Sequence, residues 1–237
     1  MEVIFFKKPK NPVIIEGFPG FGLIGTISTE FLIDHLKTEL IGKIIIDKLP
    51  AMVAIHEGKV VEPLGIFYSK KYNIVITHVV TAATGLEWPI AEAVLKIAEE
   101  LDAKEIISLE GVGNPMAKDD ENVKTYFFSS DETKRKKIKK QGCEPLNEGI
   151  VMGATAVLLI NSHFPITCFF AETHSTLPDS KASAKIIEEL DKYLDLKVDP
   201  KPLLDTAEQF EEKLKKIMLQ SQNASEEQEK KRLSYVG

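Results

Sequence analysis

The chain has 237 residues, of which 43% are hydrophobic and 28% are charged, a balance typical of a folded globular protein rather than a disordered one. The formal net charge of −6 disfavours nucleic acid as the main partner, because phosphate binding needs clustered positive charge. The longest apolar stretch, residues 150–160, is shorter than the ~20 residues that span a bilayer, so we expect no membrane contact.

The cysteine content and the N-terminus favour a cytoplasmic protein. Cys143 and Cys168 are the only cysteines, and two cysteines without metal-ligand spacing form neither a disulfide framework nor a zinc site. Residues 1–8 carry charge on both sides of a short apolar patch, unlike a signal peptide. The basic run at 134–140 lacks the interleaved aromatic residues that stack on bases, so we interpret it as a solvated helix face.

Short apolar runs rich in β-branched residues alternate with longer helical patterns along the first 200 residues. In chain order we expect a strand at 13–15, a helix at 23–37, a strand at 44–46, a hairpin or extra strands within 51–72, a strand at 74–76, a helix at 87–101, a strand at 106–109, a buried helix at 149–160, a strand at 167–171 and a helix from 178. This alternation predicts an α/β fold, a three-layer α/β/α sandwich with a mostly parallel sheet.

The C-terminal part of the chain has a different pattern. Apolar residues fall at Leu203, Ala207, Phe210, Leu214 and Ile217, and spacings of four and three predict a narrow helical seam. This seam packs either on the same domain or on a neighbouring subunit. We therefore divide the chain into a domain at 1–200, a helix at 201–219 and a polar flexible tail at 220–237, whose tip carries Leu233, Tyr235 and Val236.

A glycine-rich turn joins the first buried strand to the first helix. Gly20, Gly22 and Gly25 satisfy the G-x-G-x-x-G pattern, and Asp47 ends the next expected strand about 20 residues on, as in dinucleotide-binding sites. Glu16 and Pro19 place a carboxylate and a rigid turn where phosphates would approach. The alternative is a structural turn whose glycines allow positive φ and close helix–strand contact.

Polar side chains gather where the expected strands end. They are Glu16, Asp47, Thr81, Glu110, Glu172 and His174. Because ligands of open α/β sheets bind at the carboxyl ends of the strands, these residues could line a polar cleft with acid–base chemistry. Acids in such places also cap neighbouring turns and helices, and that interpretation stays open. The other histidines show no ligand spacing, so we expect them to be structural.

Several segments, taken in order, resemble one family. The segment 16–25 is followed by Gly111–Pro115 after a strand, by 148–153 before the buried helix, and by 171–174 leading to Pro178. This ordered set resembles the type-two proteasome assembly chaperone family, from about residue 14 to residue 217, and it is most similar to archaeal members. The abundance of Lys and Glu is compatible with a thermophilic source.

The resemblance implies a fold similar to nucleoside phosphorylases and related hydrolases, with no established catalytic centre and no cofactor. It implies a homo-oligomeric protein that acts on proteasome α subunits or on another assembly chaperone. The motif residues would be structural, and they are Gly17, Pro19, Gly20, Gly22, Gly25, Gly111, Gly113, Asn114, Pro115, Glu172 and Pro178.

The resemblance also implies a docking role for the tail. In such proteins a terminal hydrophobic–tyrosine–any motif enters pockets between α subunits. Here Tyr235 is third from the end rather than second, and Ser234 precedes it in place of a hydrophobe, with Leu233 and Val236 nearby. The tail would therefore bind either the α subunits or a partner chaperone.

Three hypotheses follow from the sequence. The first is a non-catalytic assembly chaperone that acts through protein surfaces. The second is an enzyme of the nucleoside phosphorylase or hydrolase type that uses a cleft around Glu16, Glu110, Glu172 and His174. The third is a nucleotide-binding module that uses the glycine turn and Asp47.

Overall fold

A computed structural model describes residues 1–49, 53–56, 58–80, 85–113, 123–173 and 177–205, together with positions 207, 209, 211, 212 and 216. The strands in this part of the chain are β1 (Glu2–Phe5), β2 (Val13–Gly17), β3 (Glu39–Ile45), β4 (Ala54–His56), β5 (Lys59–Val61), β6 (Leu64–Ser69), β7 (Ile74–Val79), β8 (Glu105–Gly113), β9 (Thr125–Ser129), β10 (Glu144–Pro145) and β11 (Ile166–Thr173). The helices are α1 (Ile24–His35), α2 (Glu87–Glu100), α3 (Glu132–Lys140), α4 (Gly153–Asn161), α5 (Ser180–Leu194) and α6 (Lys201–Asp205), and a 3-10 turn, η1 (Phe21–Leu23), precedes α1.

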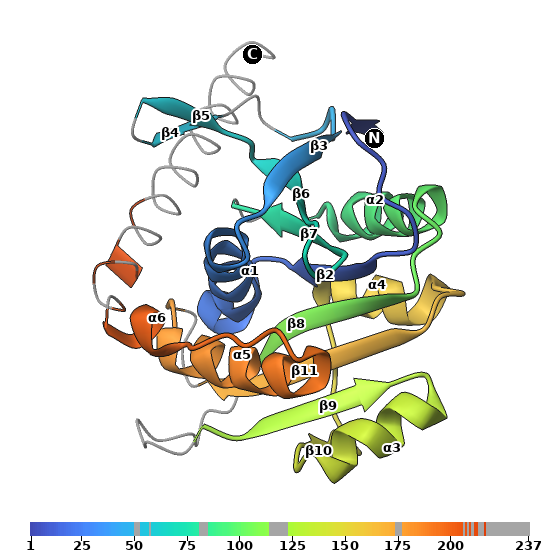
Figure 1. The fold of residues 1–237 in the computed structure, drawn as a ribbon, viewed down its shortest axis with the longest axis vertical. Coiled ribbons are helices and arrows are strands. Elements are labelled where there is room, and N and C mark those ends of the chain that lie inside the picture. The colour runs from blue at the N-terminus through green and yellow to red at the C-terminus, as the bar shows by residue number, and fades with distance from the viewer. Residues whose placement is uncertain are drawn as a thin grey trace, which may run out of the picture.

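One large sheet runs through the middle of the molecule (Figure 1). Its order across the described strands is β1-β3-β6-β7-β2-β8-β11-β9-β10. The central strands β7, β2, β8 and β11 pair in parallel, and Ile15 of β2 lies opposite both Ile76 and Ile107. Towards β1 the pairs are antiparallel, as is the β11–β9 pair, so the sheet is mixed around a parallel centre.

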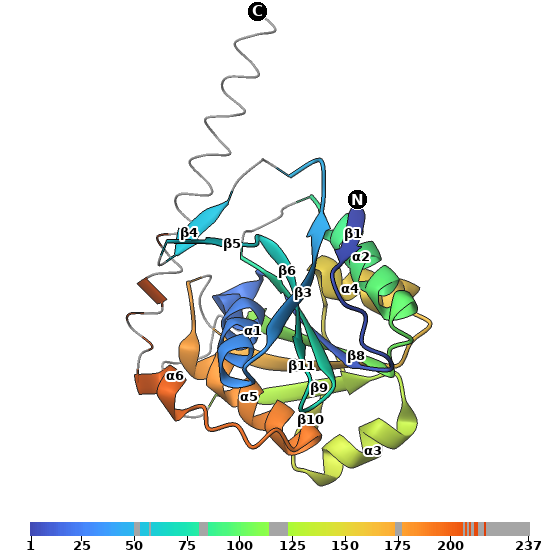
Figure 2. The same ribbon diagram turned by 45° about the horizontal axis from the view of Figure 1, so that its top comes forward.

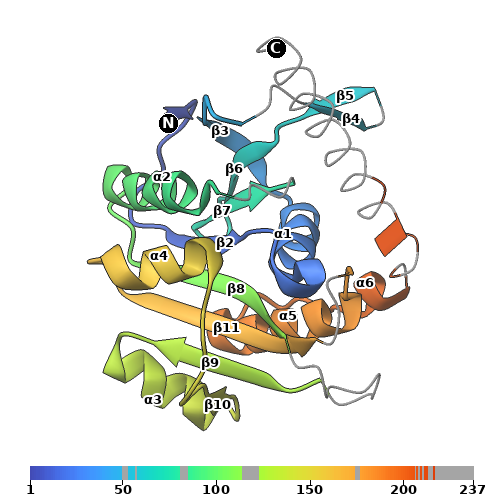
Figure 3. The same cartoon turned by 180° about the vertical axis from the view of Figure 1, so that it is seen from behind.

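Helices cover both faces of this sheet, which confirms the predicted α/β sandwich. Figure 3 shows α2 and α4 on one face, where Val94, Ile97 and Leu158 belong to one core cluster. On the other face α1 and α5 bury Ile27 and Ile187 in a second cluster. The four central strands are thus apolar on both sides, as parallel strands covered by helices require.

Local signals fixed several helix boundaries. The helix expected from residue 178 begins at Ser180, and Asp179 is its N-cap, because its side-chain oxygen accepts the Ala182 N–H at 2.9 Å. The hairpin expected within 51–72 is the β4–β5 ribbon, followed by β6; it projects from the sheet (Figure 2). In that ribbon Ile55 lies opposite Val60.

The helix predicted at 149–160 is wrong in two respects. It begins at Gly153, four residues later than expected, and it is buried on one side only. Ala154, Val157 and Leu158 face the core, whereas Ile160 is 73% exposed. The reason is that α4 lies in the outer layer, where one side of a helix meets the sheet and the other meets solvent.

Asp47 does not lie beside the glycine turn. In a dinucleotide-binding fold the acidic residue follows the strand adjacent to the first one. Here β7 and β6 separate β2 from β3. The Asp47 side chain is 84% exposed, and it lies 3.7 Å from the amino group of Met1. The spacing in the sequence suggested a ribose contact, but in the folded chain Asp47 does not lie next to the glycine turn.

Part of the C-terminal pattern falls within the described residues. Leu203 is buried in the same core cluster as α1 and α5, and Glu211 accepts the N–H of Ser180 at 2.9 Å. Other residues singled out in the sequence lie outside the described part of the chain: Thr81, Asn114, Pro115, His174, Phe210, Leu214, Ile217, Leu233, Tyr235 and Val236. Among the described helices, none has the length and apolarity of a membrane span.

Candidate functional site: a carboxyl pair beneath the glycine turn

The glycines of the turn allow backbone segments to approach one another closely. A Cβ at Gly17 would overlap the carbonyl of Gly25, and a Cβ at Gly25 would lie 2.5 Å from the carbonyl oxygen of Leu109. A Cβ at Gly111 would overlap the carbonyl of Phe21. The start of α1 therefore rests directly on the backbones of β2 and β8, which only glycine permits.

Two further contacts complete the turn. Gly22 has a φ of +63°, a conformation that favours glycine. The Gly22 carbonyl accepts the N–H of Asp179 at 2.9 Å. Oδ2 of Asp179, the side-chain oxygen that does not cap α5, accepts the Thr173 hydroxyl at 2.8 Å. The segment that begins α5 is thereby attached to the turn that begins α1. Two of the segments that carry the family resemblance, far apart in the sequence, meet here.

The Glu110 carboxylate lies against the turn at Gly20. A Cβ at Gly20 would overlap Oε1 of Glu110, so this carboxylate contacts the main chain of the turn. The same oxygen accepts the backbone N–H of Gly111 at 3.3 Å. A carboxyl group of the chain itself thus fills the space beside the turn.

Glu16 and Glu110 form a pair bridged by one hydroxyl group. Oγ1 of Thr155, in the first turn of α4, lies 3.3 Å from Oε1 of Glu16 and 3.0 Å from Oε2 of Glu110. Oγ of Ser108 lies 2.9 Å from the same Thr155 oxygen. Because a hydroxyl has one proton to donate, Thr155 cannot satisfy both carboxylates at once. Glu16 Oε2 is buried and has no hydrogen-bond partner among the described residues.

Burial changes the acidity of this pair. Burial, helped by the charge of Glu110, raises the pKa of Glu16 to about 8, although the hydrogen bonds from Ser108 and Thr155 act to lower it. Burial also raises the pKa of Glu110 to about 7, against its hydrogen bonds from Thr155 and Gly111. At neutral pH the pair therefore holds at least one proton, and a protonated Glu16 can donate the hydrogen bond that the bridge lacks.

The two members of the pair differ in their access to solute, since Glu110 is half-buried and Glu16 is fully buried. Glu16 has no exposed surface, so its carboxyl group cannot touch a ligand in this conformation. The neighbouring Cys168 is fully buried, and burial together with the charges of Glu16 and Glu110 raises the pKa of its thiol well above the usual value. A thiol in this state is a poor nucleophile, so the arrangement favours a structural cluster over a reaction centre.

The other acidic residues expected at the strand ends do not join this pair. The Glu172 carboxylate accepts the hydroxyl of Tyr126 at 2.8 Å, and this hydrogen bond raises the pKa of Tyr126 to about 12. Asp47 follows β3, which β6 and β7 separate from β2 in the sheet. Within the part of the chain that the structure describes, no group of three His, Cys, Asp or Glu residues could hold a metal ion.

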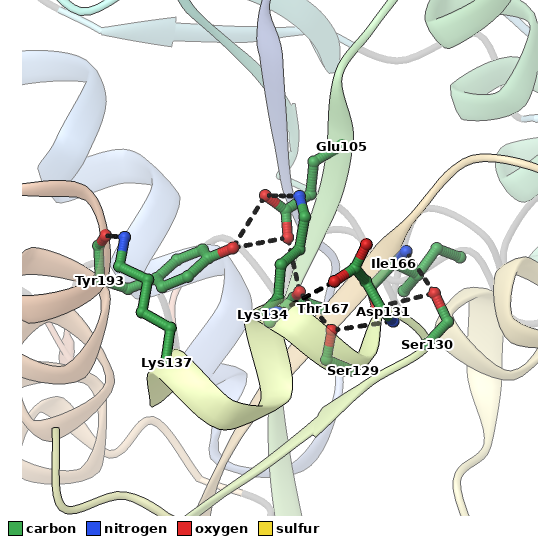
Figure 4. A network of polar contacts seen from close by, with 9 residues as sticks. All are labelled: Glu105, Ser129, Ser130, Asp131, Lys134, Lys137, Ile166, Thr167 and Tyr193. Atoms are coloured by element: carbon green, nitrogen blue, oxygen red, sulfur yellow. Dashed lines mark hydrogen bonds and ion pairs between the residues drawn. The ribbon is translucent and has the colours of Figure 1, made fainter. Parts of the chain in front are cut away.

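A second polar cluster lies at the opposite end of the strands and was missed in the sequence (Figure 4). Glu105, buried at the start of β8, accepts hydrogen bonds from Thr167 at 2.5 Å and from Tyr193 at 3.1 Å. Its other oxygen lies 2.6 Å from Nζ of Lys134. Lys137 extends over the Tyr193 ring and donates to the Tyr193 carbonyl at 2.7 Å.

This cluster ties α3 to α5 and the sheet, so two lysines of the basic run make structural contacts: Lys134 is half-buried, whereas Lys137 stays exposed to solvent. The sequence signal was a glutamate, Glu105, directly before the apolar residues Ile106 and Ile107 of an expected strand. A charge in that position needs a partner in the folded state. The partner could not be found by spacing, because Lys134 lies 29 residues further on in a different element.

Comparison with known proteins identifies the family. The model of the PAC2 family matches residues 14–218. The chain belongs to the PAC2 family. Among solved structures of this kind, Pyrococcus furiosus PbaA, described as an archaeal homolog of proteasome-assembly chaperone, has a TM-score of 0.84 and 29% identity, covering 94% of this chain and 99% of PbaA.

Two further proteins that are similar to this chain extend the comparison. Pyrococcus furiosus PbaB, described as an archaeal proteasome activator, is 21% identical with a TM-score of 0.72, and 91% of this chain and 98% of PbaB are covered. At that identity the likeness shows the fold alone. The uncharacterized protein MJ0106 of Methanocaldococcus jannaschii is 29% identical over 220 residues, which are 90% of each chain.

Proposed function

We propose that this PAC2-family protein is a proteasome assembly chaperone that works through protein surfaces and catalyses no reaction. The observation that carries the proposal is the likeness to PbaA, at 29% identity and a TM-score of 0.84 over 94% of the chain. The partners we propose are proteasome α subunits or another assembly chaperone, and the working form is a homo-oligomer in the cytoplasm.

The candidate site supports a non-catalytic role. The glycine turn is filled by contacts with Leu109, Gly111 and Asp179, and its flank is occupied by the Glu110 carboxylate. The raised pKa of Glu16 follows from burial, and the carboxyl group has no exposed surface. Perturbed carboxyl groups are common at active sites, but they also occur in structural clusters, and the lack of access favours the second case.

The C-terminal tail is the element we propose for partner docking. Its tip carries the hydrophobic residues Leu233 and Val236 beside Tyr235, after a polar segment that would supply reach. The seam that precedes it, Leu203 to Ile217, would place the tail by packing on the domain or on a neighbouring subunit.

Co-purification with proteasome α subunits tests the function and the tail separately. The full-length protein should retain α subunits on an affinity column. The variant Tyr235→Ala should reduce the retained amount at least about tenfold, as loss of an aromatic anchor does, whereas the neighbouring Ser234→Ala should not. Deletion of residues 233–237 should reduce it as much as Tyr235→Ala does.

Each result has a defined meaning. Failure of the full-length protein to bind α subunits or a partner chaperone would overturn the chaperone proposal. Binding that survives both Tyr235→Ala and the deletion would overturn tail docking and leave the chaperone role to other surfaces.

A further inference from the structure

The outer side of α3 carries dense positive charge on a protein that is acidic as a whole. Six of the chain's 30 basic residues lie within positions 134–140, although the net charge is −6. Arg135, Lys136, Lys139 and Lys140 are exposed, and their spacing in a helix places them on one side. Figure 1 shows α3 at one end of the sheet, beside β9 and β10. We call these four residues the α3 face.

The packing of α3 uses other residues of the helix. Lys134 pairs with Glu105, and Ile138 is buried in the core. The side chains of Lys139 and Lys140, by contrast, form no hydrogen bond or ion pair with any residue that the structure describes. The fold therefore gives no reason for these two charges.

The cations of the α3 face repel one another in the free protein. Arg135 and Lys139 are one helical turn apart, as are Lys136 and Lys140, and like charges at this spacing destabilise a helix. A carboxylate oxygen of Glu132 lies 2.8 Å from Nζ of Lys136, but both side chains are more than 70% exposed, so this pair is weak. The helix dipole favours cations in the last turn only, and Arg135 and Lys136 lie before it. Negative charge from a partner would remove this repulsion.

The chemistry of the α3 face favours carboxylates over phosphates. Phosphate is held best by the planar fork of arginine, and Arg135 is the only arginine in the basic run. Its Nη2 donates to the Ser129 carbonyl at 2.9 Å, so the fork is partly engaged within the fold. The other three cations are lysines, which bind single carboxylates as point charges. A helix of nine residues is about 13 Å long, so the face matches a short acidic segment, whereas a long polyanion would extend over the acidic remainder of the chain.

We propose that the α3 face binds a short segment of a partner protein that is rich in glutamate or aspartate. The inference rests on the proposed function only in taking a protein as the partner. It adds a surface of the folded domain to the C-terminal tail proposed above. Because the attraction is between exposed charges, binding should weaken as the salt concentration rises.

Fluorescence anisotropy of a short, labelled polyglutamate peptide tests the proposal on the full chain. The double variant Lys139→Gln and Lys140→Gln should raise the Kd of the peptide at least about fivefold at low salt, because it removes two of the four charges that meet the peptide. The control is Lys96→Gln and Lys104→Gln, which removes the same charge from exposed lysines of α2 and of the segment before β8. The control should leave the Kd within about twofold of the unmodified protein. Circular dichroism of both variants should show unchanged secondary structure, because all four side chains are exposed.

Two further probes show what the surface recognises. A polyglutamine peptide of the same length should not bind, since it lacks charge, and a thymidine oligonucleotide of the same length should bind more weakly than polyglutamate. Tighter binding of the oligonucleotide would overturn the proposal in favour of a nucleic-acid surface. The proposal would also be overturned by the absence of polyglutamate binding at low salt, by equal binding of polyglutamine, or by equal weakening in the two double variants.

The α-subunit co-purification assay distinguishes this proposal from the proposed function. If α subunits bind the unmodified protein and polyglutamate does not, the α3 face is refuted and the chaperone role stands. If polyglutamate binds through Lys139 and Lys140 and no α subunit or partner chaperone binds, the α3 face stands and the chaperone role is refuted.

Discussion

Replacing Glu16 by glutamine should change the pH dependence of stability in a direction that the buried carboxyl pair dictates. In the unfolded chain Glu16 loses its proton near pH 4.5, whereas in the folded protein it keeps the proton until about pH 8. Between these values ionisation stabilises only the unfolded state. The folded protein therefore loses stability as the pH rises through this window, and the glutamine variant, whose side chain does not titrate, is spared that loss.

The size of the effect follows from the same two pKa values. Each pH unit in the middle of the window changes the free energy of unfolding by about 1.4 kcal/mol, and the slope is smaller near the two pKa values, so the part between pH 5 and pH 8 amounts to about 3.5 kcal/mol. For a chain of this size 1 kcal/mol corresponds to about 2–4 °C in Tm. The Tm of Glu16→Gln relative to the unmodified protein should thus rise by about 7–14 °C from pH 5 to pH 8.

Thermal unfolding at several pH values, followed by circular dichroism, measures this difference directly. The control is Glu92→Gln, at an exposed position of α2, whose Tm difference should stay constant across the same range. A Tm difference for Glu16→Gln that does not change with pH would refute the reasoning. It would mean that Glu16 is ionised in the folded state or that the pair is open to solvent.

Three further predictions concern packing and charge. Lys134→Met should lower the free energy of unfolding by about 3–5 kcal/mol, because it leaves the buried carboxylate of Glu105 without its ion-pair partner. Lys136→Met, at an exposed position, should change the free energy of unfolding by less than about 0.5 kcal/mol. Urea unfolding measures both values. Gly25→Ala should prevent folding or destabilise by more than about 4 kcal/mol, while Gly149→Ala, which has ordinary contacts and room for a Cβ, should be nearly neutral in the same assay. Cys168 should resist a thiol reagent in the native protein and react fully in denaturant, and rapid native labelling would contradict its burial.

The order of elements could be predicted from the sequence because each signal was local. The β-branched runs gave the central strands, and the Asp179 cap marked the start of α5 through a hydrogen bond within one turn. The one-sided burial of α4 could not be predicted in this way. Its apolar pattern is uniform, and only the position of α4 in the outer layer decides which side meets the sheet.

Pairings between distant residues were also beyond the sequence. Glu16 and Glu110 were both singled out as polar residues at strand ends, but the hydroxyl that bridges them comes from Thr155, in an apolar helix. Asp47 failed as a site residue because strand adjacency, which the sequence does not specify, places β7 next to β2.

The glycine turn shows how one spacing can serve two physical purposes. In a dinucleotide site the glycines clear space so that a pyrophosphate can approach the start of the helix. Here the cleared space receives the chain itself: Glu110 contacts Gly20, the N–H of Asp179 donates to Gly22, and the carbonyl of Leu109 faces Gly25. A phosphate entering beside Gly20 would meet the Glu110 carboxyl group, and it would be repelled whenever that group is ionised. We therefore propose that the G-x-G-x-x-G pattern in this PAC2 protein serves the close packing of two strands, two helices and a carboxyl group.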